Sequence, residues 1–168
     1  MIRSKEARSR AREVLKMVGV TEAPVDVQKV AEALGFEVLA YPFPETTSGL
    51  TFIEAGIKCI GYNQNHAPVR QRFSIAHELG HYLSGHEPYD HGTTHVEGRP
   101  SYLDPQNRLE VEANEFAAEL LMPDTFLRRD VAQIGLDVPV LAKRFGVSEQ
   151  AMWIQIIDLG LASRYPPR

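Results

Sequence analysis

The sequence predicts an α+β fold in a single domain, and three observations support that prediction. Three β-rich runs lie close together at 36–41, 50–54 and 57–62. Stretches with apolar residues at helical spacing precede and follow these runs. The chain has 168 residues, of which 43% are hydrophobic, which is enough for one substantial core. We therefore expect a small antiparallel sheet that packs beside helices.

The amino-terminal helix has an apolar side and a basic polar side. The apolar side consists of Ala7, Ala11, Val14, Leu15 and Val18. The polar side has two acidic residues, Glu6 and Glu13. Its basic residues are more numerous: Arg3, Lys5, Arg8, Arg10, Arg12 and Lys16. A solvated helix face explains this pattern, and the alternative is a surface that binds nucleic acid or an acidic partner.

A short helix and the three β-rich runs come next. Asp26 can cap the helix, which Gly35 would end. Turn-forming residues at 42–49 and at Gly56 separate the runs from one another. Cys59 is the single cysteine and lies in an apolar run. We therefore expect a buried structural thiol rather than a nucleophile, and no internal disulfide.

The next helix contains the sequence HELGH, which is typical of a zinc site with its own general base. Pro68 suits its first turn, and an apolar stripe follows at helical spacing: Val69, Phe73, Ala76, Gly80 and Leu83. His77 and His81 are four residues apart, so both rings can reach one ion at about 2.0–2.1 Å. Glu78 lies about 100° further round the helix, where it can accept a proton from water at the metal. Gly80 suggests that another element packs closely over this turn.

The residues after HELGH exclude the metzincin class. That class reads HExxHxxGxxH, but Ser84 and Glu87 stand where its glycine and third histidine would be. Gly85 and His86 are nearby but out of register. The third ligand is therefore expected to be a glutamate from a second helix.

The stretch 107–122 predicts such a helix. Its apolar face consists of Leu109, Ala113, Phe116, Ala117 and Leu120, and a solvated acidic stripe is expected opposite it: Glu112, Glu115 and Glu119. Glu110 lies only about 60° from the apolar centre, where a carboxylate needs a partner such as zinc. The alternative is an ordinary half-exposed glutamate. Asn114, one turn on, could accept a hydrogen bond from a ligand histidine and fix its tautomer.

An irregular segment separates the two zinc helices, from His86 to Gln106. A segment of this length is often a lid or a binding loop, and we expect early proteolysis there. Its histidines, His86, His91 and His95, are expected to be solvated, with adventitious metal binding as the alternative. His95 and Tyr102 are the candidates for stabilising the oxyanion of the tetrahedral intermediate.

The carboxyl-terminal part has the spacing of a helix-turn-helix, with helices at 138–145 and 149–159. The second helix has no Lys or Arg between Glu149 and Gly160, so it offers nothing that would neutralise phosphates. We therefore expect a packing or partner-docking helix pair and no direct DNA binding. Trp153 is a candidate anchor for a protein contact.

These patterns define three segments. We expect a metallopeptidase domain at 1–134, the helix-turn-helix-like pair packed on it at 135–161, and a flexible tail at 162–168. The chain has no apolar run of 18 residues and no leader-like segment, so we expect a cytoplasmic protein without a membrane partner. The net charge of −4 argues against general affinity for nucleic acids.

Four segments resemble the ImmA/IrrE family of metallo-endopeptidases. They are PVDVQKVAEALGFEV (24–38), RQRFSIAHELGHYL (70–83), EVEANEFAAELLMP (110–123) and LAKRFGVSEQAM (141–152). The resemblance implies a minimal gluzincin-like zinc (Zn2+) peptidase domain. It also implies that His77, His81 and Glu110 bind zinc and that Glu78 is the catalytic glutamate.

The same resemblance implies a function. It is that of a zinc-dependent endopeptidase, a hydrolase that cleaves a helix-turn-helix repressor of the Xre/Cro/CI type encoded nearby. Such cleavage would derepress stress, phage or mobile-element genes. The alternative is a zinc-stabilised adaptor, or a component of toxin–antitoxin type, that binds a regulator without cleaving it.

Overall fold

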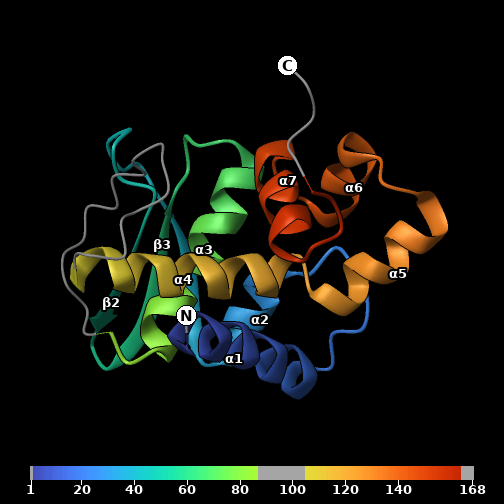
Figure 1. The fold of residues 1–168 in the computed structure, drawn as a ribbon. Coiled ribbons are helices and arrows are strands. Elements are labelled where there is room, and N and C mark those ends of the chain that lie inside the picture. The colour runs from blue at the N-terminus through green and yellow to red at the C-terminus, as the bar shows by residue number, and fades with distance from the viewer. Residues whose placement is uncertain (1, 87–104, 164–168) are drawn as a thin grey trace.

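The computed structural model describes residues 2–86 and 105–163, and its fold class is α+β as predicted (Figure 1). Within these residues the chain forms seven helices and three strands. In chain order they are α1 (Ile2–Val18), α2 (Val27–Ala33), β1 (Phe36–Tyr41), β2 (Gly49–Glu54), β3 (Ile57–Asn63), α3 (Pro68–Leu83), α4 (Pro105–Leu121), α5 (Asp124–Ile134), α6 (Val138–Phe145) and α7 (Glu149–Asp158). Helix α5 lies in a stretch for which we make no prediction from the sequence.

The sheet is mixed, so the expectation of an antiparallel sheet is wrong for one of its two pairings. The strand order is β1-β3-β2, with β2 antiparallel and β1 parallel to β3. The turn at Ala55 and Gly56 has positive φ values of 50° and 80° and closes the β2–β3 hairpin. The buried amide of Asn63, at the end of β3, lies 2.8–3.1 Å from three carbonyl oxygens of the 43–47 segment. This segment connects β1 to β2, which lie on opposite sides of β3 in the sheet. Local sequence signals do not show that the connection crosses the position of β3.

Helix α3 packs on both the sheet and α4, and α1 packs on the other side of α4 (Figure 1). Phe116, Leu120 and Leu79 are fully buried where these helices meet. A Cβ added to Gly80 would lie 3.0 Å from the Cα and the carbonyl oxygen of Ala113. The close packing expected at Gly80 is therefore present, and it brings the HELGH helix against α4. Cys59 is buried in β3, as expected for a structural thiol.

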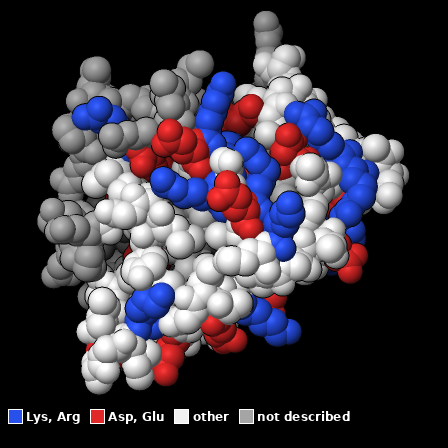
Figure 2. Space-filling view, turned by 90° about the horizontal axis from the view of Figure 1, so that it is seen from below, with Lys and Arg blue, Asp and Glu red and all other residues white. Residues whose placement is uncertain are grey.

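The expectation of a solvated acidic stripe on α4 is wrong, because α1 covers most of it. Glu119 is fully buried and lies 3.1 Å from both Arg8 and Arg12. Glu115 pairs with Arg8, which also donates to Gln155 at 3.1 Å. The basic side of α1 is therefore partly an interface between helices. On the face seen in Figure 2, basic and acidic side chains are interleaved.

Helices α6 and α7 follow the predicted boundaries closely. Gly146 ends α6 in the left-handed conformation, and the Ser148 hydroxyl caps α7 by accepting from the Ala151 amide at 3.1 Å. Gln155 is buried and donates to the Met122 carbonyl at 2.8 Å, which fixes α7 against the end of α4. Throughout 2–86 and 105–163, each helix is too short or too polar to cross a bilayer.

Candidate metal centre

Helix α3 places two histidines and a glutamate at the interface with α4. Proline occupies its first turn, and the buried part of the helix runs from Ser74 to His81. The Ser74 hydroxyl donates back to the Arg70 carbonyl at 2.8 Å. His77, Glu78 and His81 are each less than 10% exposed. The site therefore lies at a covered edge of the helix, where water has limited access.

Glu110 on α4 faces the two histidines. Its two carboxylate oxygens lie 3.1 Å from His77 Nε2 and 3.1 Å from His81 Nε2, and the two Nε2 atoms are 2.9 Å apart. Among the described residues, these three form the group that could hold a metal ion. The structure thus brings together the three residues that the sequence analysis selects as ligands.

The donor set fits a metal ion of the zinc type. Ligand atoms about 2.0–2.1 Å from a tetrahedral ion are about 3.3 Å apart, close to the spacing of these donors. Asn114 Oδ1 lies 2.8 Å from His77 Nδ1. Because a carboxamide oxygen can only accept, Nδ1 of His77 has the proton and Nε2 presents its lone pair to the site. Asn114 thus lies where the sequence analysis places it.

The charges of His77 and Glu110 shift each other's pKa values. Burial lowers the pKa of His77, but hydrogen bonding to Glu110 and the negative charges of Glu78 and Glu110 outweigh burial, so the pKa is raised overall. Burial also raises the pKa of Glu110, but its hydrogen bonds to both histidines outweigh burial and hold that pKa well below its usual range. The carboxylate is therefore ionised at neutral pH, and the metal and protons compete for the same nitrogens.

Thr51 is a contact of the site that sequence reasoning missed. Its hydroxyl donates to Glu78 Oε2 at 2.9 Å from strand β2. Gly49 lies on the same strand, and a Cβ there would come within 3.3 Å of Glu78 Cγ. A threonine in a β-rich run gives no local signal of this role, because the contact depends on how β2 packs against α3.

His86 and Glu112 also differ from expectation, because neither is solvated. His86 Nδ1 lies 3.0 Å from His81 Nδ1, and His86 Nε2 lies 3.2 Å from Glu112 Oε2. The side chains are 6% and 10% exposed. The expectations of a solvated His86 and a solvated Glu112 are wrong for the same reason: the chain that follows α3 turns back and brings His86 against α4. The other candidates of this segment, His91, His95 and Tyr102, lie outside the described residues.

Comparison with known proteins agrees with this picture. The chain is similar to a solved Mycobacterium tuberculosis transcriptional regulator, with a TM-score of 0.66 and 19% identity. The match covers 91% of this chain and 46% of that one, so this chain spans less than half of the regulator's length. Curated proteins show no match to the chain.

A family model identifies the domain. Residues 31–155 match the model of the Peptidase_M78 family, described as an IrrE N-terminal-like domain. The matched range includes both metal-site helices, all of α6 and most of α7. A metallopeptidase family implies a metal, and the donors of α3 and α4 are suited to hold one. The chain belongs to the Peptidase_M78 family of IrrE N-terminal-like domains.

Proposed function

We propose that this chain is a zinc-dependent endopeptidase that cleaves a helix-turn-helix repressor. The observation that supports this most is the convergence of His77, His81 and Glu110 beside the buried carboxylate of Glu78. Two imidazoles and one carboxylate are the ligands of many catalytic zinc sites, which keep the fourth position open. Nitrogen and oxygen donors of this kind favour zinc over magnesium or calcium.

The chemistry follows from the residues around the site. Zinc held there would supply Lewis acidity, activating water and polarising the scissile carbonyl. Glu78 accepts the proton of the attacking water and later delivers it to the leaving amine. Thr51 donates to Oε2 of Glu78, so we assign this proton transfer to Oε1. Asn114 keeps the His77 ring in the tautomer that a metal requires.

A transcriptional repressor is the substrate that the available observations favour. Four segments of the chain resemble a family whose members act on such repressors, and the family match names a peptidase, for which a protein substrate is expected. Helix α7 has no Lys or Arg, so we propose that it docks protein rather than DNA. Trp153 is partly buried and lies with Leu136 and Glu149 around a shallow hollow between α6 and α7. The lining of this hollow combines apolar and acidic side chains, which suits a protein segment.

The decisive experiment compares the chain with its Glu78→Gln variant on a purified helix-turn-helix repressor encoded beside it. Zinc-loaded wild type should produce discrete fragments, whose new termini mass spectrometry identifies. A chelator should stop cleavage, and added zinc should restore it. Glu78→Gln should retain zinc and fold but lose at least about 100-fold in rate, because the proton acceptor is gone.

The same comparison separates the enzyme from the adaptor. If Glu78→Gln still relieves repression in cells as well as wild type does, the domain acts by binding its regulator, and the endopeptidase proposal is wrong. Trp153→Ala adds a second test. It should weaken cleavage of the intact repressor while leaving cleavage of a short peptide nearly unchanged. An equal loss on both substrates would assign Trp153 to the core.

A further inference from the structure

The two histidines of the metal centre are supported in different ways. His77 donates directly to Asn114 on α4. His81 has another histidine as its partner, because His86 Nδ1 lies 3.0 Å from His81 Nδ1, with the two rings inclined at 63°. Glu112 then completes a line of three side chains from α3 back to α4.

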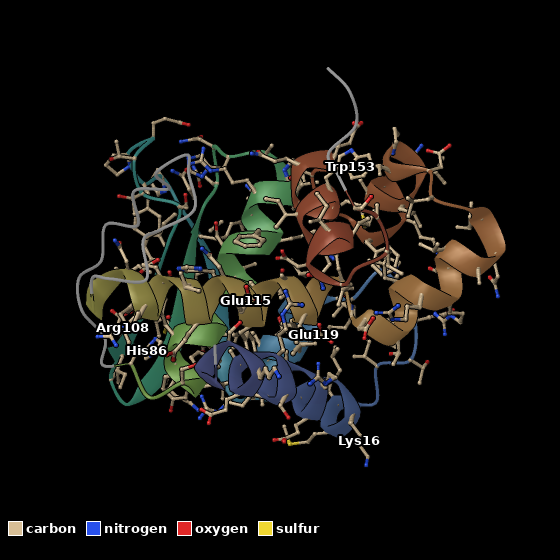
Figure 3. All side chains as sticks on the ribbon, in the orientation of Figure 1. Lys16, His86, Arg108, Glu115, Glu119 and Trp153 are labelled. Carbon is tan, nitrogen blue, oxygen red and sulfur yellow. The ribbon has the colours of Figure 1, made fainter. Side chains whose placement is uncertain are left out.

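Local structure at the end of α3 brings His86 into this position. Gly85 has a φ of 70°, which lets the chain turn back sharply. The amides of Gly85 and His86 donate to the carbonyls of Tyr82 and His81 at 3.1 and 3.0 Å. The side chain of His86, which is labelled in Figure 3, is 6% exposed, and its ring centroid lies 5.2 Å from that of His81. A solvated loop histidine would not need this turn.

The proton positions in this line follow from the role of His81. Its Nε2 lies 3.1 Å from Glu110 at the metal centre, so this nitrogen must offer a lone pair to a metal. The proton is then on Nδ1, which donates to Nδ1 of His86. His86 in turn has its proton on Nε2 and donates to Glu112. Every donor in the line then meets an acceptor. The alternative arrangement of neutral rings, with protons on Nε2 of His81 and Nδ1 of His86, would leave no lone pair for a metal on His81 and none of the ring protons facing Glu112.

We propose that His86 and Glu112 are positioning residues of the metal centre, which fix the ring orientation and tautomer of His81 and so raise its affinity for metal. The inference rests on the proposed function, because it assumes that the site holds zinc. Partners of ligand histidines typically contribute about 10- to 100-fold to metal affinity. Glu112 is two residues from Glu110, and its carboxylate contacts His86 and not the pair of Nε2 atoms.

The first test measures zinc affinity by competition with a chromophoric chelator at a fixed pH. His86→Ala should bind zinc about 10- to 100-fold more weakly than wild type. His86→Asn should recover part of that loss, because its side-chain oxygen can accept from His81 as Asn114 does from His77. His66→Ala is the matched control. It also removes a buried histidine, but one that contacts Glu45 and Asn63 instead of the metal centre.

The outcomes separate the possible roles. Equal zinc affinity of His86→Ala and wild type would overturn the inference and make the contact a structural link between α3 and α4. Equal losses in His86→Ala and His66→Ala would also overturn it, because the effect would then reflect general destabilisation. Failure of wild type to bind zinc would instead refute the proposed function.

A second measurement needs no variant at His86 and so does not depend on how such a variant folds. Nitrogen-15 NMR of the zinc-loaded wild type should show a proton on Nδ1 of His81 and on Nε2 of His86. In Glu112→Ala, the Nε2 proton of His86 loses its acceptor, so its signal should shift and exchange faster with water. A proton on Nδ1 of His86 in wild type would contradict the proposed line of hydrogen bonds.

Discussion

Glutamates in the two halves of helix α4 have different partners and different roles. Glu110 and Glu112, in the amino-terminal half, contact histidines at the metal centre. Glu115 and Glu119, one to two turns further on, pair with arginines of α1 (Figure 3). All four are glutamates of one helix, so the difference between the halves comes from their partners.

The partners decide what each half can do. A histidine can give up its proton near neutral pH and then bind a metal, so the first half forms a site that exchanges protons for an ion. Arginine stays charged at every accessible pH and does not bind metal cations, so the second half forms ion pairs that fix α1 on α4. One helix thus combines a reactive end with a structural end, and substitutions in the two halves should have different effects.

The largest expected effect is on metal binding, which should depend on the first half of α4 and not on the second. Glu110→Gln replaces a charged ligand with a neutral one and should weaken zinc binding by more than the roughly 100-fold that outer partners contribute. Glu115→Gln, the matched change in the other half, should leave zinc affinity unchanged. Elemental analysis and chelator competition measure both. Full metal content with unchanged affinity in Glu110→Gln would remove Glu110 from the site.

A large effect on stability should come from the second half. Glu119→Ala leaves Arg8 and Arg12 without their buried acceptor and should lower the free energy of unfolding by about 2–3 kcal/mol. Arg12→Ala is the milder control and should cost about 1 kcal/mol or less, because the Arg12 side chain is 47% exposed. Urea denaturation measures both. A loss of zinc affinity in Glu119→Ala that exceeds its loss of stability would show that the two halves are coupled.

Lowering the pH should weaken metal binding in the first half of α4 before it affects the ion pairs of the second half. The raised pKa of His77 lies above the ordinary value of 6.5, so protons begin to displace metal at a higher pH than for a free imidazole. Zinc affinity should be constant above that pKa and fall by about tenfold per pH unit below it for each proton displaced. The pairs between α1 and α4 contain no histidine and compete for no metal ion. Chelator competition between pH 8 and pH 5.5, with circular dichroism as the folding control, tests this. An affinity that stays level down to pH 5.5 would contradict it.

A smaller effect is expected at the contact between α3 and the first half of α4. Gly80→Ala would gain about 1 kcal/mol in helix propensity, but its Cβ meets the Ala113 backbone. Overpacking of this kind costs about 1–3 kcal/mol, so a net loss of up to about 2 kcal/mol is expected. Zinc affinity should fall as well, because Glu110 moves with α4. A more stable variant with unchanged affinity would show that α4 can shift without disturbing the site.

The sequence by itself predicted the features that depend on local geometry. The spacing in HELGH puts His77 and His81 on one side of a helix, and the position of Glu110 near the apolar face of α4 selects it among four glutamates. The same reasoning placed Asn114, the capping residues and the strand boundaries. The positions of these side chains on their elements follow from local rules, because periodicity and capping are properties of a short stretch of chain.

Only the tertiary structure decided which distant groups meet. Arg8 and Glu115 are 107 positions apart, so nothing local shows that the acidic stripe of α4 is covered. The parallel pairing of β1 with β3, the contact of Thr51 with Glu78 and the approach of His86 to His81 depend equally on packing. A polar position in a sequence pattern indicates that the side chain needs a polar partner. It does not indicate whether that partner is water, an arginine or a histidine. The packed fold selects among them, because it brings one kind of partner within reach of each side chain.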